Sequence, residues 1–168
     1  MKLALLLMLA MLIASCGDTY EMQSESMAPT IKPGDVVDAD MHAYEDTTPA
    51  RWDMVVYNSP NNDGEDWVHR VVGLPSDVLD ITDSGLFING KRERYAEQTL
   101  KIRHTAGYND NSKIIFPYTV PHGHYLLLGD NPAEAIDGRY IGPTPLNKIK
   151  GKILGVNPLA TKIVKENK

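Results

Sequence analysis

Short runs of β-branched and apolar residues recur along the chain, and each run is bounded by glycine, proline or aspartate. Such runs are typical of β-strands, because branched side chains fit the pleated surface of a sheet. The predicted strands span residues 35–39, 54–57, 68–72, 78–81, 86–91, 125–129 and 149–156. Beyond the N-terminal segment no long stretch repeats at the helical period, so the pattern predicts an all-β domain.

Two segments depart from the simple strand pattern. Asn89-Gly90 predicts a hairpin, because both residues tolerate the positive φ of a type I′ turn. Arg92 to Ser112 is polar and shows neither period, so we expect an insertion hairpin or an extended cap without chemistry of its own.

The N-terminus carries a targeting pattern. Lys2 precedes an apolar run from Leu3 to Ala14, and Ser15-Cys16-Gly17 follows. A basic start, a short apolar stretch and small residues indicate a secretory signal, and the run is shorter than the ~20 residues of a membrane-spanning helix. The end of the run also resembles a bacterial lipobox, in which Cys16 is acylated. The alternative is an uncleaved signal anchor, and both place the rest of the chain on the outer face of a membrane.

The bulk composition limits the remaining possibilities. The 168 residues carry a formal net charge of −5 without basic clusters, which argues against nucleic acid as a partner. A single cysteine excludes an intrachain disulfide, and the five histidines are not at metal-binding spacings. We expect no metal and no cofactor. The predicted division is a signal or anchor at 1–16, a tether at 17–23, one catalytic domain at 24–158 and a tail at 159–168.

One motif points to nucleophilic chemistry. In the segment Ser24-Glu25-Ser26-Met27-Ala28-Pro29-Thr30, a serine stands directly before methionine and enters a strand-like run. Four later segments extend this motif: residues 51–57, residues 68–77, residues 85–91, and residues 128–142 with 149–152. In their order and spacing these boxes resemble those of type I signal peptidases, serine peptidase family S26. The resemblance covers nearly everything from Ser24 to Val156 and implies small curled antiparallel sheets.

The resemblance assigns the central roles. It makes Ser26 the nucleophile, which needs a base to take its proton because a serine hydroxyl is a poor nucleophile at neutral pH. Bacterial members usually carry a lysine immediately before the Arg-Val of the third box, and this chain has His69 there. The endoplasmic-reticulum branch of the family also has histidine at this place. Ala135 stands where the bacterial pattern has a serine that helps to hold the lysine, which is consistent with a change to a Ser–His pair.

Two aspartates are candidates for the third member of the site. Asp137 could orient His69 through a ring N–H and complete a triad with Ser26. We prefer it to Asp130 because Arg139 follows at a spacing that suits a fixed carboxylate–guanidinium pair. Either aspartate could instead belong to a structural ion pair.

The oxyanion of the reaction also needs donors. By the resemblance these are the backbone N–H of Ser26 and the hydroxyl of Ser24. Met27 and Pro29 would shape the pocket that accepts small side chains before the cut, or would simply pack in the core.

The sequence thus predicts a membrane-tethered, extracytoplasmic serine endopeptidase. It would cleave signal peptides or related precursors after small residues through an acyl-enzyme, and its partners would be precursor proteins and the membrane. Two alternatives stay open. The first is a processing protease dedicated to one secretion or conjugation cargo, and the second is an inert lipoprotein that binds extended peptides by strand addition.

Overall fold

The computed structural model describes residues 18–61, 64–94 and 114–167. The predicted signal segment with Cys16, and most of the predicted hairpin or cap at 92–112, lie outside the described residues. Within them the fold is mostly β and antiparallel, as predicted. No helix in the described ranges is long and apolar enough to cross a bilayer.

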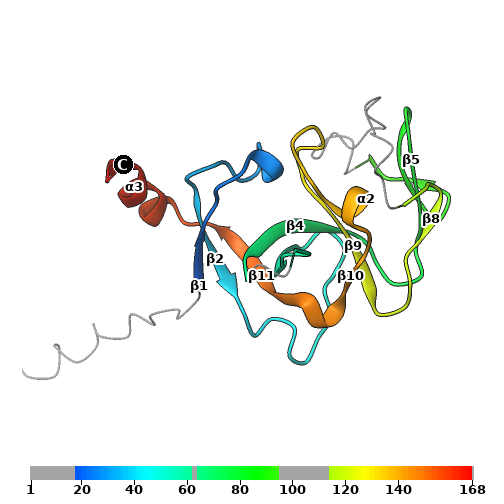
Figure 1. Ribbon diagram of the computed structural model, residues 1–168, viewed down its shortest axis with the longest axis horizontal. Coiled ribbons are helices and arrows are strands. Elements are labelled where there is room, and N and C mark those ends of the chain that lie inside the picture. Colours follow the sequence, from blue (N-terminus) through cyan, green and yellow to red (C-terminus); the bar gives the residue numbers. More distant parts are fainter. Residues whose placement is uncertain (1–17, 62–63, 95–113, 168) are drawn as a thin grey trace, which may run out of the picture.

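A seven-stranded antiparallel sheet forms the body of the molecule and curls on itself (Figure 1). Its order is β1-β2-β11-β3-β4-β9-β10, so β11 from the end of the chain lies between early strands. The bounds are β1 Asp18–Glu21, β2 Val36–Asp40, β3 Met54–Asn58, β4 Asp66–Gly73, β9 His124–Leu128, β10 Thr144–Pro145 and β11 Ile149–Val156. Short helical turns interrupt the strands, among them η1 Glu25–Met27, α2 Gly138–Ile141 and η2 Leu146–Lys148.

Both faces of the central strands are covered. In β3, Val55 and Tyr57 belong to one buried cluster, whereas Val56 belongs to another. Because successive side chains of a strand point to opposite faces, a run of buried residues requires a core on each side. The first cluster also holds Leu127 and Ile149. The second cluster joins the strands to Met27, which stands directly after the candidate nucleophile.

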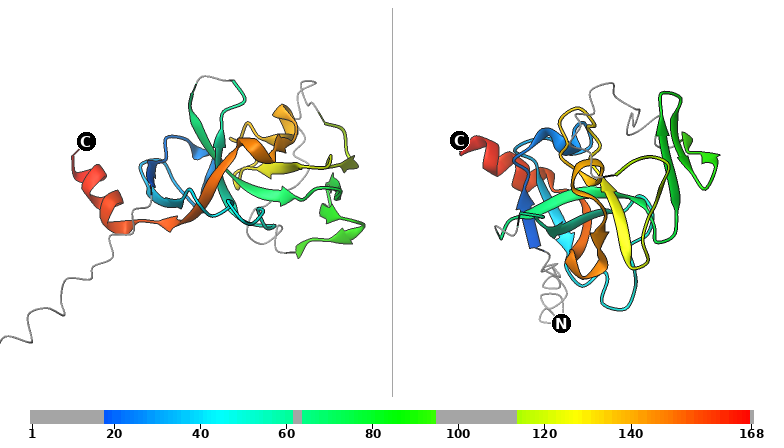
Figure 2. Two further views of the ribbon diagram at one scale, coloured as in Figure 1. Left: turned by 90° about the horizontal axis from the view of Figure 1, so that it is seen from below. Right: turned by 45° about the vertical axis from the view of Figure 1, so that its right-hand side comes forward.

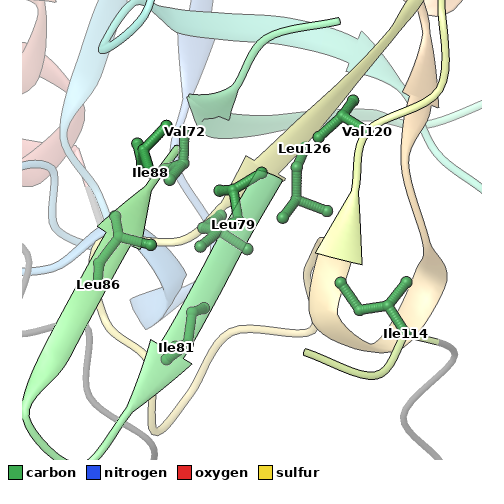
Figure 3. Packing of buried hydrophobic residues seen from close by; sticks show 9 residues of the cluster. Val72, Leu79, Ile81, Leu86, Ile88, Ile114, Val120 and Leu126 are labelled. Atoms are coloured by element: carbon green, nitrogen blue, oxygen red, sulfur yellow. The ribbon is translucent and has the colours of Figure 1, made fainter. Parts of the chain in front are cut away.

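A smaller four-stranded sheet packs at the other end of the molecule. Its order is β7-β6-β5-β8, with β5 Val78–Thr82, β6 Gly85–Ile88, β7 Lys91–Arg92 and β8 Tyr118–Thr119. Leu79, Ile81, Leu86 and Ile88 pack there against Leu126 of the large sheet (Figure 3). The predicted hairpin turn is confirmed, because Asn89 and Gly90 both have positive φ and Ile88 pairs with Lys91.

Two predicted segments have more structure than the sequence pattern indicated. The expected tether at 17–23 contains β1, whose backbone pairs with β2 although its side chains are mostly polar. The expected tail at 159–168 is mostly the helix α3, Pro158–Glu166, which extends from β11 (Figure 2). The Asn157 side chain caps α3 by accepting from the Ala160 N–H. Thr161 then joins the helix to β2, because its hydroxyl accepts from the Val36 N–H at 2.8 Å.

Candidate active site

The predicted nucleophile lies in a short helical turn rather than in a strand. Ser26 is the middle residue of η1, and its side chain is mostly buried. Met27 anchors the turn in the core with no exposed surface. The Ser26 carbonyl accepts from the Asn131 N–H at 2.9 Å, which fixes the turn to the segment that follows β9.

Gly129 makes this attachment possible. A β-carbon placed there would lie 2.6 Å from the carbonyl oxygen of Ser26 and 2.4 Å from the β-carbon of Ala135. Any side chain at residue 129 would therefore push η1 away from the segment that follows β9. This close approach explains why the Leu128-Gly129-Asp130-Asn131 motif has glycine at its second position.

The hydroxyls of Ser24 and Ser26 lie 3.0 Å apart, within hydrogen-bond distance. Both side chains open into a cleft of about 620 Å³, which His69 and Trp67 also line. One wall is β1, the edge strand of the large sheet, with Tyr20 and Glu21. The structure thus brings three of the predicted site residues to one cleft.

His69 lies on β4 and is almost fully buried, with 3% of its surface exposed. Its ring Nδ1 is 2.7 Å from the hydroxyl of Tyr57. Trp67 packs edge-on against both rings, with interplanar angles of 78° to His69 and 79° to Tyr57. These contacts hold the imidazole in one orientation on the strand.

Burial controls the protonation of His69. Its pKa is lowered to about 4, mainly by desolvation; the positive charge of Arg139 also lowers it, whereas the carboxylates of Asp137 and Asp130 act in the opposite direction. The imidazole is consequently neutral at physiological pH. A neutral imidazole can accept a proton, which a base in this position must do.

The pH dependence of stability follows from this shift. An unfolded histidine takes up its proton near pH 6.5, whereas His69 in the folded chain does so near pH 4. The unfolded state binds more protons between these values, so the stability is complete above about pH 6.5 and falls as the pH drops toward 4, by about 3 kcal/mol. We expect denaturant unfolding at pH 4.5 and 7 to show this loss. The difference in the free energy of unfolding between pH 7 and pH 4.5 should shrink by that amount in His69→Gln. It should stay unchanged in His122→Gln, a control at an exposed position.

The two candidate acids are both engaged in buried ion pairs. The Asp137 carboxylate accepts from Nε of Arg139 at 2.8 Å and from the Gly129 N–H at 2.9 Å. Asp130 accepts from Arg70 at 2.8 and 2.6 Å. The predicted pair of Asp137 and Arg139 is present.

The structure departs from the predicted triad at its third member. Tyr57, rather than Asp137 or Asp130, is the hydrogen-bond partner of His69 Nδ1 in the described residues. Arg139 and the Gly129 N–H direct the Asp137 oxygens elsewhere. The charge of Asp137 nevertheless acts on His69 through space, because it favours the protonated ring.

Removing the Asp137 charge should destabilise the fold. Asp137→Asn leaves the buried guanidinium of Arg139 without its counter-charge, and breaking such a pair costs about 3 kcal/mol or more. For a domain of this size we expect a Tm lower by roughly 10 °C. Thermal unfolding measures this against Asp46→Asn, which changes an exposed loop residue. Equal Tm values for the two variants would contradict the structural role of the pair.

The two residues that were predicted to shape the substrate pocket do not line the cleft. Met27 is wholly buried in the core, and Pro29 is exposed, and neither lines the cleft. Tyr57 and Trp67 were missed by the sequence analysis. The signal that could have found them is strand register, since Tyr57 pairs with Trp67 and both share a face with His69.

Comparison with known proteins identifies the family. The sequence profile of the family described as signal peptidase, peptidase S26, matches residues 1–156. The chain belongs to this family. Signal peptidase IB of Staphylococcus aureus is 30% identical over 148 residues, covering 80% of this chain and 74% of the relative. Signal peptidase I of Bacillus caldolyticus is 30% identical over 140 residues, covering 80% and 75%.

A solved structure is also similar. The crystal structure of a signal peptidase I from Enterococcus faecalis is 28% identical and covers 63% of this chain and 97% of that chain, with a TM-score of 0.48. By its relatives the chain is homologous to signal peptidase I, a serine endopeptidase.

Proposed function

We propose that this signal peptidase homologue is a membrane-tethered serine endopeptidase with Ser26 as nucleophile and His69 as base. The observation that carries the proposal is the single cleft into which both side chains open. Its substrates would be precursor proteins that bear signal peptides, which the family membership supports.

The reaction would begin when the Ser26 oxygen attacks the carbonyl carbon of the scissile bond. Nε2 of His69 takes the hydroxyl proton as the new C–O bond forms, and later gives it to the leaving amine. The peptide C–N bond breaks and leaves an ester on Ser26. Water then attacks this ester, with His69 again as base, and releases the signal peptide as a carboxylic acid.

The oxyanion formed in each step needs hydrogen-bond donors. The backbone N–H of Ser26 and the hydroxyl of Ser24 would supply them. The Ser24 hydroxyl is 3.0 Å from the Ser26 hydroxyl, so it lies beside the reacting atom. A small residue before the cut would fit beside this turn, which is fixed to the segment that follows β9.

The N-terminal segment would place this chemistry at the outer face of a membrane. Cys16, the proposed site of lipidation, is ten positions before Ser26. Extended chain covers at most about 3.6 Å per residue, which keeps the serine within a few tens of Å of the bilayer. An uncleaved anchor would give the same geometry.

The charge of the cleft favours a restricted set of substrates, as in a dedicated processing protease. Four carboxylates line the cleft, from Glu21, Glu65, Asp66 and Glu134, whereas no lysine or arginine of the described residues does. Lys150 offsets the charge of Asp66 at 2.7 Å. Because acidic side chains, and no lysine or arginine of the described residues, line it, the cleft would favour precursors with basic residues near the cut.

A panel of precursors tests the proposed function. The chain from residue 17 onward, in detergent, should cut preproteins with alanine before the cleavage site and should leave matched leucine variants intact. Within the alanine set, lysine beside the cut should give faster cleavage than glutamate. Binding of all precursors without cleavage would reject the protease and favour the peptide-binding alternative.

A further inference from the structure

We propose that Tyr57 is the positioning residue of the base, and that its hydroxyl oxygen accepts the Nδ1–H of His69 and thereby keeps Nε2 free to receive a proton. This inference rests on the proposed function for its kinetic consequence. The hydrogen bond itself is a property of the folded chain and is testable without any substrate.

The strand register brings the two side chains together. Tyr57 of β3 is directly opposite Trp67 of β4, and His69 is two residues further along β4. Residues with this diagonal relation share a face of the sheet and lie within reach of aromatic side chains. Both are buried, with 1% of Tyr57 and 3% of His69 exposed, and the Tyr57 oxygen lies 2.7 Å from Nδ1.

The hydroxyl of Tyr57 keeps its proton. Burial raises the pKa of Tyr57 above its usual value, and the nearby charge of Asp137 raises it further. A neutral phenol can either donate to Nδ1 or accept from it. If it donates, the ring proton is on Nε2, and this nitrogen cannot act as base toward Ser26. If it accepts, the proton is on Nδ1, and Nε2 has a free lone pair.

Only the accepting arrangement is compatible with the protonated ring. When Nε2 takes the proton of Ser26, both ring nitrogens carry hydrogen, and Nδ1–H needs an acceptor in a buried place. The Tyr57 oxygen provides one. The carboxylate of Asp137 cannot, because Arg139 and the Gly129 N–H hold its oxygens. Tyr57 thus has the place that an aspartate has in a Ser-His-Asp triad, without a charge of its own.

The experiment uses Tyr57→Phe, which removes one oxygen and keeps the ring that packs against Trp67. Orienting partners of histidine typically contribute about 10–100-fold, so we expect kcat to fall by that factor with little change in KM. Tyr44→Phe is the control, because it removes the hydroxyl of a different, partly buried tyrosine, which donates to Asp53. The control should retain full kcat.

Nitrogen NMR of ¹⁵N-histidine-labelled protein gives the readout that a merely structural role would not change. With His69→Gln to assign the signal, the intact chain should show the ring proton on Nδ1 at pH 7. In Tyr57→Phe the ring should show both tautomers, and the pKa of His69 should fall, because the charged ring loses an acceptor. The charges that face the ring, from Asp137, Arg139 and Asp130, are the same in both proteins.

The outcomes separate this inference from the proposed function. A proton on Nε2 in the intact chain, or a pKa that rises in Tyr57→Phe, would show that Tyr57 donates and would overturn the inference. An unchanged kcat in Tyr57→Phe would overturn it as well. If the intact chain cuts no precursor but carries the ring proton on Nδ1, the role of Tyr57 in orienting His69 is supported and the proposed protease function is rejected.

Discussion

Replacing Ser26 with alanine should remove almost all of the cleavage activity. In serine peptidases the loss of the nucleophile costs on the order of 10⁶-fold in kcat, because the covalent route disappears. The substitution removes one oxygen from a residue that is 8% exposed, and leaves η1 with its contact between the Ser26 carbonyl and Asn131. The fold should therefore be kept, and precursor binding should stay near that of the intact chain.

Initial rates with one precursor measure this effect, and thermal unfolding verifies the fold. Ser84→Ala, which changes an exposed serine in the turn between β5 and β6, serves as the control and should retain full activity. Cleavage in Ser26→Ala within tenfold of the intact chain would exclude Ser26 as nucleophile.

Replacing His69 with glutamine should cause a loss comparable to that of Ser26→Ala. Without a base the Ser26 hydroxyl keeps its proton, and glutamine cannot accept and return one at neutral pH. Because the two residues act in one step, the double variant should lose no more than either single variant. Additive losses would show that the two side chains do not act together.

The activity of the intact chain gives a second measure of His69. Since its pKa is about 4, kcat/KM should stay level from pH 8 to about 5.5 and fall only below that. His122→Gln should leave the profile unchanged, because this side chain is exposed and lies outside the cleft. A rate that rises only in the alkaline range would assign the base to a lysine.

The strands were predictable because their side chains report burial directly. In β3, the residues Val55-Val56-Tyr57 are buried on both faces of the sheet. A continuous apolar run of this kind predicts a strand without any knowledge of its neighbours. The turn at Asn89-Gly90 was predictable for a local reason as well, since it depends on backbone conformation.

Other elements depend on contacts that no local pattern records. β1 is polar and forms because its backbone pairs with β2. α3 is short, and its start depends on Asn157 as cap and on Thr161 against Val36. The sequence pattern predicted only a tether for the first segment and a tail for the second.

The same contrast holds for the candidate site. Ser24, Ser26 and His69 were predictable because their boxes resemble the family, and the structure places all three at one cleft. The partner of His69 was not, because it depends on the register of β3 against β4, which brings Tyr57 to Nδ1. The sequence favoured Asp137 because of its spacing to Arg139, and in the structure Arg139 binds the Asp137 oxygens at 2.8 Å.

The most direct test of the account is to trap the ester on Ser26 with hydroxylamine during cleavage of one precursor. Hydroxylamine competes with water for an acyl-enzyme, so mass spectrometry should find a hydroxamate at the new C-terminus of the released signal peptide. The hydroxamate should disappear together with all cleavage in Ser26→Ala. Cleavage that yields only the carboxylic acid, and that continues in Ser26→Ala, would contradict the account.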